Sequence, residues 1–135
     1  MNKLKILAVD DEQDVLAVIK QCCHDYDVAT ETLPLKAVER INKENFDIII
    51  VDYQMPKING IELLEEIKEV CADRKYVSIF CTAYGTIYLF EEERSRGLFD
   101  LFIEKPFVMD KFKKALQKAM TILDPEVAIS DSVLL

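Results

Sequence analysis

The fold follows from the stretch Phe46-Asp47-Ile48-Ile49-Ile50-Val51-Asp52, a near-continuous apolar run that ends in a carboxylate. Runs of this kind are typical of strands that are covered on both faces, as in a parallel sheet. A second apolar run, from Leu4 to Val9, ends in Asp10-Asp11. We therefore expect two buried strands to bring three carboxylates together. Gathered carboxylates repel one another and resist desolvation, so a cation or a reaction is expected to need them.

Short apolar runs alternate with amphipathic stretches five times along the chain. This alternation predicts an α/β fold of the (βα)5 type, with a doubly wound parallel sheet and right-handed crossovers. Apolar residues at helical spacing fill the gaps, and the segment Ile87–Arg94 carries the least regular pattern. The expected strands are Leu4–Val9, Asp27–Thr30, Phe46–Val51, Tyr76–Cys81 and Phe99–Ile103. The expected helices lie near residues 15–23, 35–41, 60–71, 87–94 and 112–123.

Composition limits the classes of function. The chain has 135 residues, which fits one domain with one core, and half of them are hydrophobic, which argues against disorder. A formal net charge of −8 argues against direct nucleic-acid binding, which needs clustered Lys and Arg. No apolar stretch approaches the ~20 residues that span a bilayer, and no signal-peptide pattern is present, so we expect a cytoplasmic protein without membrane contact. The cysteines form no metal-binding pattern and are expected to be reduced core residues: Cys22, Cys23, Cys71 and Cys81.

The candidate site lies just beyond the expected strands, because ligands of open α/β sheets bind at the carboxyl ends of the strands. Acids follow the first and third strands, a hydroxyl follows the fourth and a lysine follows the fifth. The segments at these positions are Asp10-Asp11, Glu31-Thr32, Asp52-Tyr53-Gln54, Thr82-Ala83-Tyr84 and Glu104-Lys105-Pro106.

Each of these side chains has a chemical and a purely structural explanation. Asp10, Asp11 and Asp52 offer the hard oxygen ligands that suit Mg²⁺. Alternatively, the first two acids cap the first helix and Asp52 is a turn residue. Lys105 would neutralise the acids and hold a phosphoryl group, or it is an exposed lysine. Thr82 would donate to a phosphoryl oxygen, or it caps the next helix.

Four motifs occupy the strand ends: Val9-Asp10-Asp11-Glu12, Val51-Asp52-Tyr53-Gln54-Met55-Pro56 with Gly60, Thr82-Ala83-Tyr84-Gly85 and Glu104-Lys105-Pro106-Phe107. In order and spacing they resemble the motifs of receiver domains of two-component response regulators, over about residues 3–123. The resemblance implies a flavodoxin-like, CheY-like sheet with the strand order 2-1-3-4-5. It also implies a receiver domain over residues 1–123 and a tail or linker stub over residues 124–135. The last two motifs further resemble receivers of the nitrogen-regulation type.

The resemblance implies a role for each acid. Asp52 would be the phosphoacceptor, and its carboxylate would attack a phosphohistidine or a small acyl phosphate to give an aspartyl phosphate. Asp10 and Asp11 would hold Mg²⁺ (or Mn²⁺) together with Asp52 and the backbone carbonyl of Gln54. The cation would screen the charge between the nucleophile and the phosphodonor.

The resemblance also implies a switch. Lys105 and Thr82 would bind the phosphoryl oxygens. Thr82 would move toward the new group, and Phe102, which lacks a tyrosine hydroxyl, would turn inward by packing alone. The surface of the fourth helix, fifth strand and fifth helix would then change. Gln54 and Tyr84 occupy the positions that tune the lifetime of the aspartyl phosphate in receivers.

The resemblance implies a sensor histidine kinase or a histidine phosphotransfer protein as the partner. We expect a monomer that can form a homodimer through the switching surface on phosphorylation. A receiver is not a turnover enzyme on an external substrate. Two other functions stay open on this fold. One is an aspartyl-nucleophile phosphatase, in which a second acid follows the nucleophile by two residues, as Glu12 follows Asp10. The other is an interaction module, either a flavin binder or a receiver locked in one state; Asp10-Asp11 would repel a flavin phosphate.

Overall fold

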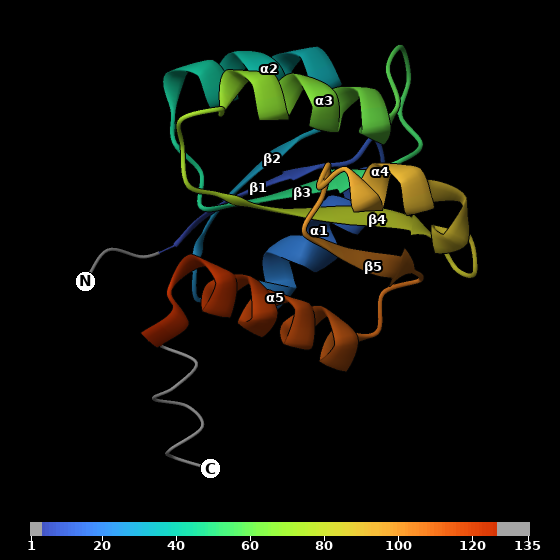
Figure 1. Ribbon diagram of the computed structural model, residues 1–135. Helices are drawn as coiled ribbons and strands as arrows, with labels where there is room; N and C mark the ends of the chain where they lie inside the picture. The colour runs from blue at the N-terminus through green and yellow to red at the C-terminus, as the bar shows by residue number, and fades with distance from the viewer. Residues whose placement is uncertain (1–3, 127–135) are drawn as a thin grey trace.

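The computed structural model describes residues 4–126, which form a parallel sheet between two layers of helices (Figure 1). The strands are β1 (Lys5–Val9), β2 (Asp27–Glu31), β3 (Ile48–Asp52), β4 (Val77–Ala83) and β5 (Leu101–Lys105). The helices are α1 (Gln13–Cys22), α2 (Pro34–Lys43), α3 (Gly60–Val70), the short 3-10 helix η1 (Ile87–Phe90), α4 (Glu91–Ser95) and α5 (Met109–Leu123).

The sheet has the strand order β2-β1-β3-β4-β5, with every neighbouring pair parallel. This confirms the predicted (βα)5 fold and its order. The apolar run that began the sequence analysis forms the central strand β3, and all five of its residues are buried. A strand with no polar face can only lie where helices cover both sides, which explains its central position.

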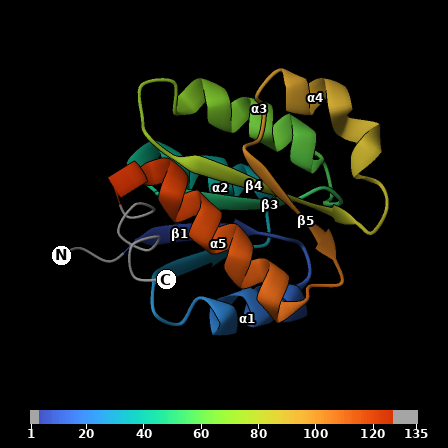
Figure 2. The ribbon, with the colours of Figure 1, turned by 60° about the horizontal axis from the view of Figure 1, so that its bottom comes forward.

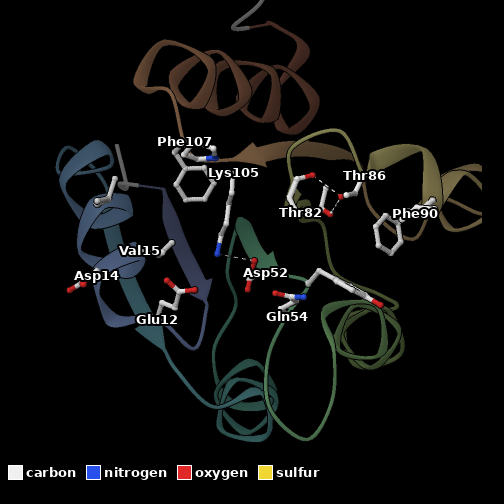
Figure 3. Close-up of a pocket in the computed structure, with 15 residues that line it drawn as sticks. Glu12, Asp14, Val15, Asp52, Gln54, Thr82, Thr86, Phe90, Lys105 and Phe107 are labelled. Atoms are coloured by element: carbon white, nitrogen blue, oxygen red, sulfur yellow. Dashed lines mark hydrogen bonds and ion pairs between the residues drawn. The ribbon is translucent and has the colours of Figure 1, made fainter.

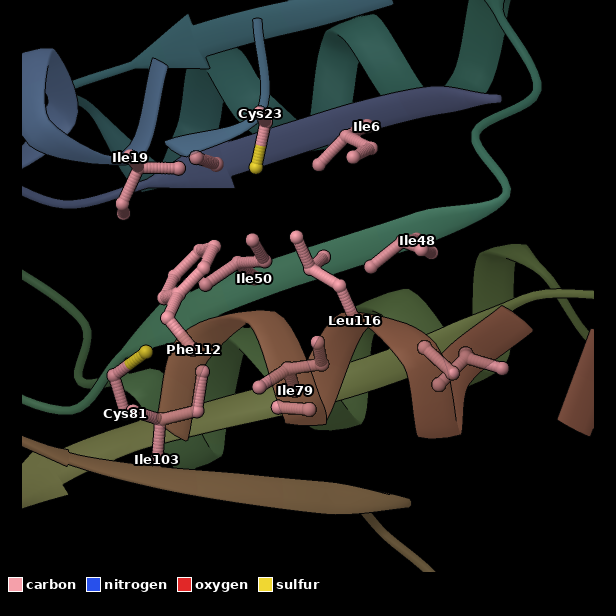
Figure 4. Close-up of a cluster of buried hydrophobic side chains, with 14 of the residues drawn as sticks. Ile6, Ile19, Cys23, Ile48, Ile50, Ile79, Cys81, Ile103, Phe112 and Leu116 are labelled. Atoms are coloured by element: carbon pink, nitrogen blue, oxygen red, sulfur yellow. The ribbon is translucent and has the colours of Figure 1, made fainter. Parts of the chain in front are cut away.

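Two hydrophobic layers hold the helices on the sheet. α1 and α5 cover one face, and α2, α3 and η1 cover the other (Figures 1 and 2). Side chains alternate along β3, so Ile48 and Ile50 join the first layer while Ile49 and Val51 join the second. Figure 4 shows the first layer, where Phe112 of α5 packs beside Ile50. Each such side chain contributes about 1.5–3 kcal/mol on burial.

The ends of the elements differ from the predicted ones. β4 continues to Ala83, and β5 begins two residues later than predicted and ends at Lys105. Phe46 and Phe99, which the apolar pattern assigned to strands, are 5% and 4% exposed but precede the paired residues. Both side chains pack in the hydrophobic layer under α2 and α3, and a buried residue need not pair in a strand. α5 begins at Met109, three residues before its predicted start, and the segment 87–94 is divided between η1 and α4.

The cysteines are free thiols, as predicted. Cys23, Cys71 and Cys81 are buried, and Cys22 is half-buried. Burial, with the neighbouring Cys22, raises the pKa of the Cys23 thiol to about 12, so this group is a protonated, unreactive core residue at neutral pH.

The last helix, α5, ends at Leu123, just before Asp124-Pro125. The predicted tail covers residues 124–135, and residues 127–135 lie outside the described part of the chain. The domain boundary at residue 123 therefore stays a prediction. Among residues 4–126, no helix has the length and apolarity needed to cross a bilayer.

Candidate functional site

The ends of β1, β3, β4 and β5 meet at one edge of the sheet and bring the predicted site residues together (Figure 3). Asp52 is the last residue of β3, Lys105 is the last residue of β5, and Asp10 follows β1 directly. A cleft of about 800 Å³ opens at this edge. It is lined by Glu12, Asp14, Val15, Val18, Asp52, Tyr53, Gln54, Thr82, Ala83, Thr86, Leu89, Phe90, Lys105, Pro106 and Phe107.

The acids form a compact cluster. One carboxylate oxygen from each of Asp10, Asp11 and Asp52 lies within 4.8 Å of the other two. Opposite ligands of a Mg²⁺ ion stand about 4.2 Å apart, since each Mg–O distance is about 2.1 Å. With Lys105 as the neighbouring cation, the three ionised acids keep two uncompensated negative charges. The donor atoms and the charge therefore fit a small divalent cation after slight side-chain movement.

Asp10 is held at both carboxylate oxygens. The Glu12 N–H donates to Oδ1 at 2.9 Å, and the Lys105 ammonium donates to Oδ2 at 2.8 Å. The alternative that Asp11 caps the first helix is wrong, because Glu12 is the N-cap of α1 and its side chain makes no capping hydrogen bond. Asp11 is exposed at the edge of the cluster, which leaves its carboxylate accessible to a cation.

Lys105 bridges two acids that come from different strands. Its Nζ lies 2.8 Å from Asp10 Oδ2 and 3.0 Å from Asp52 Oδ1, and its side chain is 23% exposed. Burial alone would lower the pKa of Lys105, but the hydrogen bonds to Asp10 and Asp52 outweigh it and the pKa is raised. The alternative of a freely exposed lysine is therefore wrong.

Asp52 is 5% exposed, and its surroundings shift its acidity. Burial raises the pKa of this carboxyl group to about 6, while Lys105 opposes the rise and Asp10 adds to it. The alternative of a surface turn residue does not fit a carboxylate this deeply placed. At neutral pH Asp52 is an ionised group that water solvates poorly.

The segment after β3 fixes the backbone of Asp52. The Tyr53 N–H donates to the Cys81 carbonyl at 2.9 Å, and the Gly60 N–H donates to the Tyr53 carbonyl at 2.8 Å. A Cβ on Gly60 would lie 2.8 Å from the Tyr53 Cα and would overlap the Asp52 carbonyl oxygen, so only glycine fits here. Gln54 is exposed beside Asp52, and among residues 4–126 no N–H donates to its backbone carbonyl.

Thr82 lies inside β4 and is buried, so the alternative that it caps the next helix is wrong. Its hydroxyl contacts the Thr86 hydroxyl, with 2.6 Å between the oxygens. Figure 3 shows the pair on the far side of the cleft from Lys105. Sequence reasoning missed Thr86. The only signal in the sequence was a second threonine four residues after Thr82. That spacing does not predict the turn that brings the two hydroxyls together.

Phe102 and Tyr84 stand apart from the other predicted residues. Phe102 is half-buried on β5, and the Arg94 guanidinium lies 5.2 Å from the centre of its ring. Tyr84 is 76% exposed and does not line the cleft. The structure thus places Asp52, Gln54, Thr82 and Lys105 on the wall of one cleft, with Asp10 and Asp11 beside Asp52 and the two aromatic residues outside the cleft.

Comparisons with known proteins agree with this arrangement. Residues 6–117 match a family model described as the response regulator receiver domain. Sporulation initiation phosphotransferase F of Bacillus subtilis is 29% identical over 124 residues, which cover 90% of this chain and 97% of that protein. Chemotaxis protein CheY of Listeria monocytogenes is 34% identical over 119 residues, which cover 86% and 98% of the two chains. The solved structure of chemotaxis protein CheY4 of Vibrio cholerae aligns with a TM-score of 0.78 at 25% identity, covering 87% and 98% of the two chains.

Proposed function

Because the chain belongs to the family of response regulator receiver domains, we propose that Asp52 is the residue that accepts the phosphoryl group in a two-component phosphorelay. One observation carries the proposal. Asp52 is a buried carboxylate at the end of the central strand, paired with a lysine and beside two further acids. Water solvates such a carboxylate poorly, and its neighbours hold it in one position. Both properties favour its use as a nucleophile.

The transfer needs one new bond and one broken bond. A carboxylate oxygen of Asp52 forms a bond to phosphorus, and the bond from phosphorus to the donor breaks. The donor is a phosphohistidine or a small acyl phosphate, and the electron pair of the broken bond stays with its leaving imidazole or carboxylate. Asp52 must be ionised to attack, and with a pKa of about 6 it is ionised at neutral pH.

We infer that Asp10 and Asp11 hold Mg²⁺ (or Mn²⁺) together with Asp52 and the backbone carbonyl of Gln54. The clustered carboxylate oxygens and their uncompensated charge support this ligand set, as does the Gln54 carbonyl, which accepts no N–H from residues 4–126. When bound, the cation supplies screening between the nucleophile and the negatively charged phosphodonor.

Lys105 and Thr82 are the proposed ligands of the phosphoryl oxygens. The Lys105 ammonium already lies 3.0 Å from Asp52, so it can follow the charge from the carboxylate to the phosphoryl group. Thr82 must turn from Thr86 toward Asp52 to donate its proton. The space it leaves would let Phe102 turn inward from β5, which would alter the surface of α4, β5 and α5.

Gln54 and Tyr84 are the proposed regulators of the lifetime of the aspartyl phosphate. Gln54 lines the cleft next to Asp52, so its side chain can influence the approach of a hydrolytic water. Tyr84 is largely exposed on the loop after β4 and lies outside the cleft, so its proposed role rests on the resemblance to receivers alone.

A sensor histidine kinase or a histidine phosphotransfer protein is the proposed donor, since the cleft must admit a phosphorylated imidazole. The phosphoryl group of such a donor comes from ATP, so we propose that the chain acts in the cytoplasm. The chain would then be a signalling component and not a turnover enzyme on an external substrate. The relatives reported above belong to sporulation and chemotaxis, so the resemblance to nitrogen-regulation receivers stays a prediction.

The alternatives fit less well. A phosphatase with Asp10 as nucleophile would attack through a carboxylate whose two oxygens accept from the Glu12 N–H and from Lys105, whereas Asp52 contacts Lys105 through one oxygen. A flavin phosphate would meet the acids at the end of β1. A receiver locked in one state would lack part of the phosphorylation set, whereas Asp52, Thr82 and Lys105 line the cleft and Asp10 and Asp11 lie beside Asp52.

A homodimer through α4, β5 and α5 completes the proposal. β5 is an edge strand between these two helices (Figures 1 and 2). α4 carries Glu91, Glu92 and Glu93, while exposed lysines such as Lys111 and Lys114 lie on α5. A two-fold pairing would place acidic α4 against basic α5. Sedimentation with Mg²⁺ and beryllofluoride, a phosphoryl mimic, should show a larger species than without it, and an unchanged mass would refute the dimer.

Mass spectrometry after incubation with acetyl phosphate and Mg²⁺ tests the central proposal. The wild-type chain should gain the mass of one phosphoryl group, and Asp52→Asn should gain none. Asp27→Asn, which alters an exposed acid at the start of β2, should react as the wild type does. The proposal fails if the wild type gains no mass while a known receiver reacts, or if Asp52→Asn still gains it.

A further inference from the structure

The Thr82 hydroxyl is engaged in a specific hydrogen bond in this structure. Thr86 Oγ1 lies 2.6 Å from the Ala83 carbonyl oxygen and 2.6 Å from Thr82 Oγ1. A carbonyl cannot donate, so the single hydroxyl proton of Thr86 goes to Ala83. Thr82 must therefore donate its own proton to Thr86. The proton that a phosphoryl oxygen would need from Thr82 is already bound elsewhere.

Thr86 does not act here as an ordinary helix cap. It is the N-cap of η1, where threonine side chains usually accept a backbone N–H from the first helical turn. Its side chain makes no such bond and turns back to Ala83 and Thr82 instead. The Thr86 hydroxyl therefore does not stabilise η1 as a cap, and its position needs another explanation.

The loop that carries Thr86 is fixed from β5. The Gly85 N–H donates to the Glu104 carboxylate at 2.5 Å, and the Tyr84 N–H donates to the Lys105 carbonyl at 3.1 Å. Gly85 has a φ of 78°, which a residue with a side chain rarely adopts. These contacts hold Thr86 at a defined distance from Thr82, so the bond between the hydroxyls is built into the fold.

We propose that Thr86 is a positioning residue that holds the Thr82 hydroxyl away from Asp52 until a phosphoryl group arrives. The inference rests on the proposed function and deepens it, because it names what the phosphoryl group competes with. Thr82 is 3% exposed, so its donor has no ready water as a substitute partner. Thr86 is half-buried beside the cleft, so water can replace Thr82 at its oxygen after the switch. The bond therefore favours the resting arrangement and weakens phosphoryl binding.

Calorimetric titration of the full chain with beryllofluoride in saturating Mg²⁺ tests this role. Thr86→Val keeps the shape but leaves the Thr82 donor unpaired in the resting form. One hydrogen bond corresponds to roughly a fivefold change in affinity, so Thr86→Val should bind beryllofluoride about fivefold more tightly. Thr86→Ser keeps the hydroxyl and should restore the wild-type affinity. Thr121→Val, which removes a similar bond from a threonine to a carbonyl on α5, is the matched control and should change nothing.

A second background separates positioning from mere structure. In Thr82→Ala there is no hydroxyl to hold, so adding Thr86→Val should leave the affinity unchanged. A gain of the same size in that background would overturn the inference, because it would show that Thr86 acts on the loop alone. Equal affinity of Thr86→Val and wild type would overturn the inference and leave the proposed function standing. Absence of binding to the wild type itself would overturn the proposed function, and the role of Thr86 with it.

Discussion

The Nζ of Lys105 lies 3.0 Å from Oδ1 of Asp52, and this pair joins the ends of β5 and β3 across the intervening strand β4. The lysine side chain is 23% exposed and that of the aspartate is 7% exposed, so both charges are largely removed from water. In the absence of a divalent cation, Lys105 supplies the positive charge that both Asp52 and its neighbour Asp10 contact. The stability of the metal-free protein should therefore depend on it.

Replacing Lys105 by methionine should destabilise the metal-free protein. The change leaves two buried carboxylates without their cation, which costs about 3 kcal/mol in comparable cases. Urea unfolding in the presence of a chelator measures the loss, and Mg²⁺ should recover part of it. Lys5→Met removes an exposed ion pair to Glu44 and should cost less than about 1 kcal/mol. Equal losses in the two variants would contradict the prediction.

Replacing Asp52 by asparagine should stabilise the metal-free protein in a pH-dependent manner. Burial raises the pKa of the folded carboxyl group to about 6 from 3.8, so folding favours the protonated form. The stability that this group contributes is complete below pH 3.8 and is lost as the pH rises through 6. Asparagine resembles the protonated form, so it should add about 2 to 3 kcal/mol at pH 7.5 and almost nothing near pH 4.

The measurement for Asp52→Asn is thermal unfolding at several pH values with a chelator present. Asp27→Asn, an exposed acid on β2, serves as the control and should shift the melting temperature little at any pH. A difference between Asp52→Asn and the wild type that does not grow between pH 4 and pH 7.5 would show that ionisation of Asp52 is not the cause.

Asp11 should matter for the cation and little for the fold. Its side chain is exposed and caps no helix, so Asp11→Asn should leave the metal-free stability within about 0.5 kcal/mol of the wild type. The loss of one charged ligand should weaken Mg²⁺ binding roughly tenfold, measured by the rise in melting temperature with Mg²⁺. Asp25→Asn, an acid of similar exposure far from the cleft, should bind as the wild type does. Equal Mg²⁺ affinity in the two variants would remove Asp11 from the ligand set.

The sequence predicted those features of the site that depend on where strands end. Apolar runs that stop at Asp10 and Asp52 locate two acids, and the parallel arrangement brings them together. The exact start of β5 was missed, because a buried loop residue such as Phe99 has the same apolar signature as a strand residue. The bond from Thr82 to Thr86 was missed because it depends on the turn around Gly85, and single hydrogen bonds of this kind leave no periodic pattern.

Gly60 provides a test of how the fold positions the site, because two effects of Gly60→Ala have opposite signs. Gly60 is the first residue of α3, and alanine is the better helix former by about 1 kcal/mol. The added Cβ would lie 2.8 Å from the Tyr53 Cα and would overlap the carbonyl of Asp52. Backbone atoms cannot turn aside as a flexible side chain does, and such overpacking costs about 1–3 kcal/mol.

We expect the steric effect to exceed the helix propensity, so Gly60→Ala should destabilise the protein by about 2 kcal/mol in urea unfolding. Because the overlap falls on Asp52, the same variant should also bind Mg²⁺ more weakly than the wild type. Glu65→Ala lies on the exposed side of α3 and should change stability by less than about 0.5 kcal/mol without affecting Mg²⁺. A more stable Gly60→Ala would mean that the α3 terminus moves freely relative to β3, and that Asp52 owes its position to Lys105 instead.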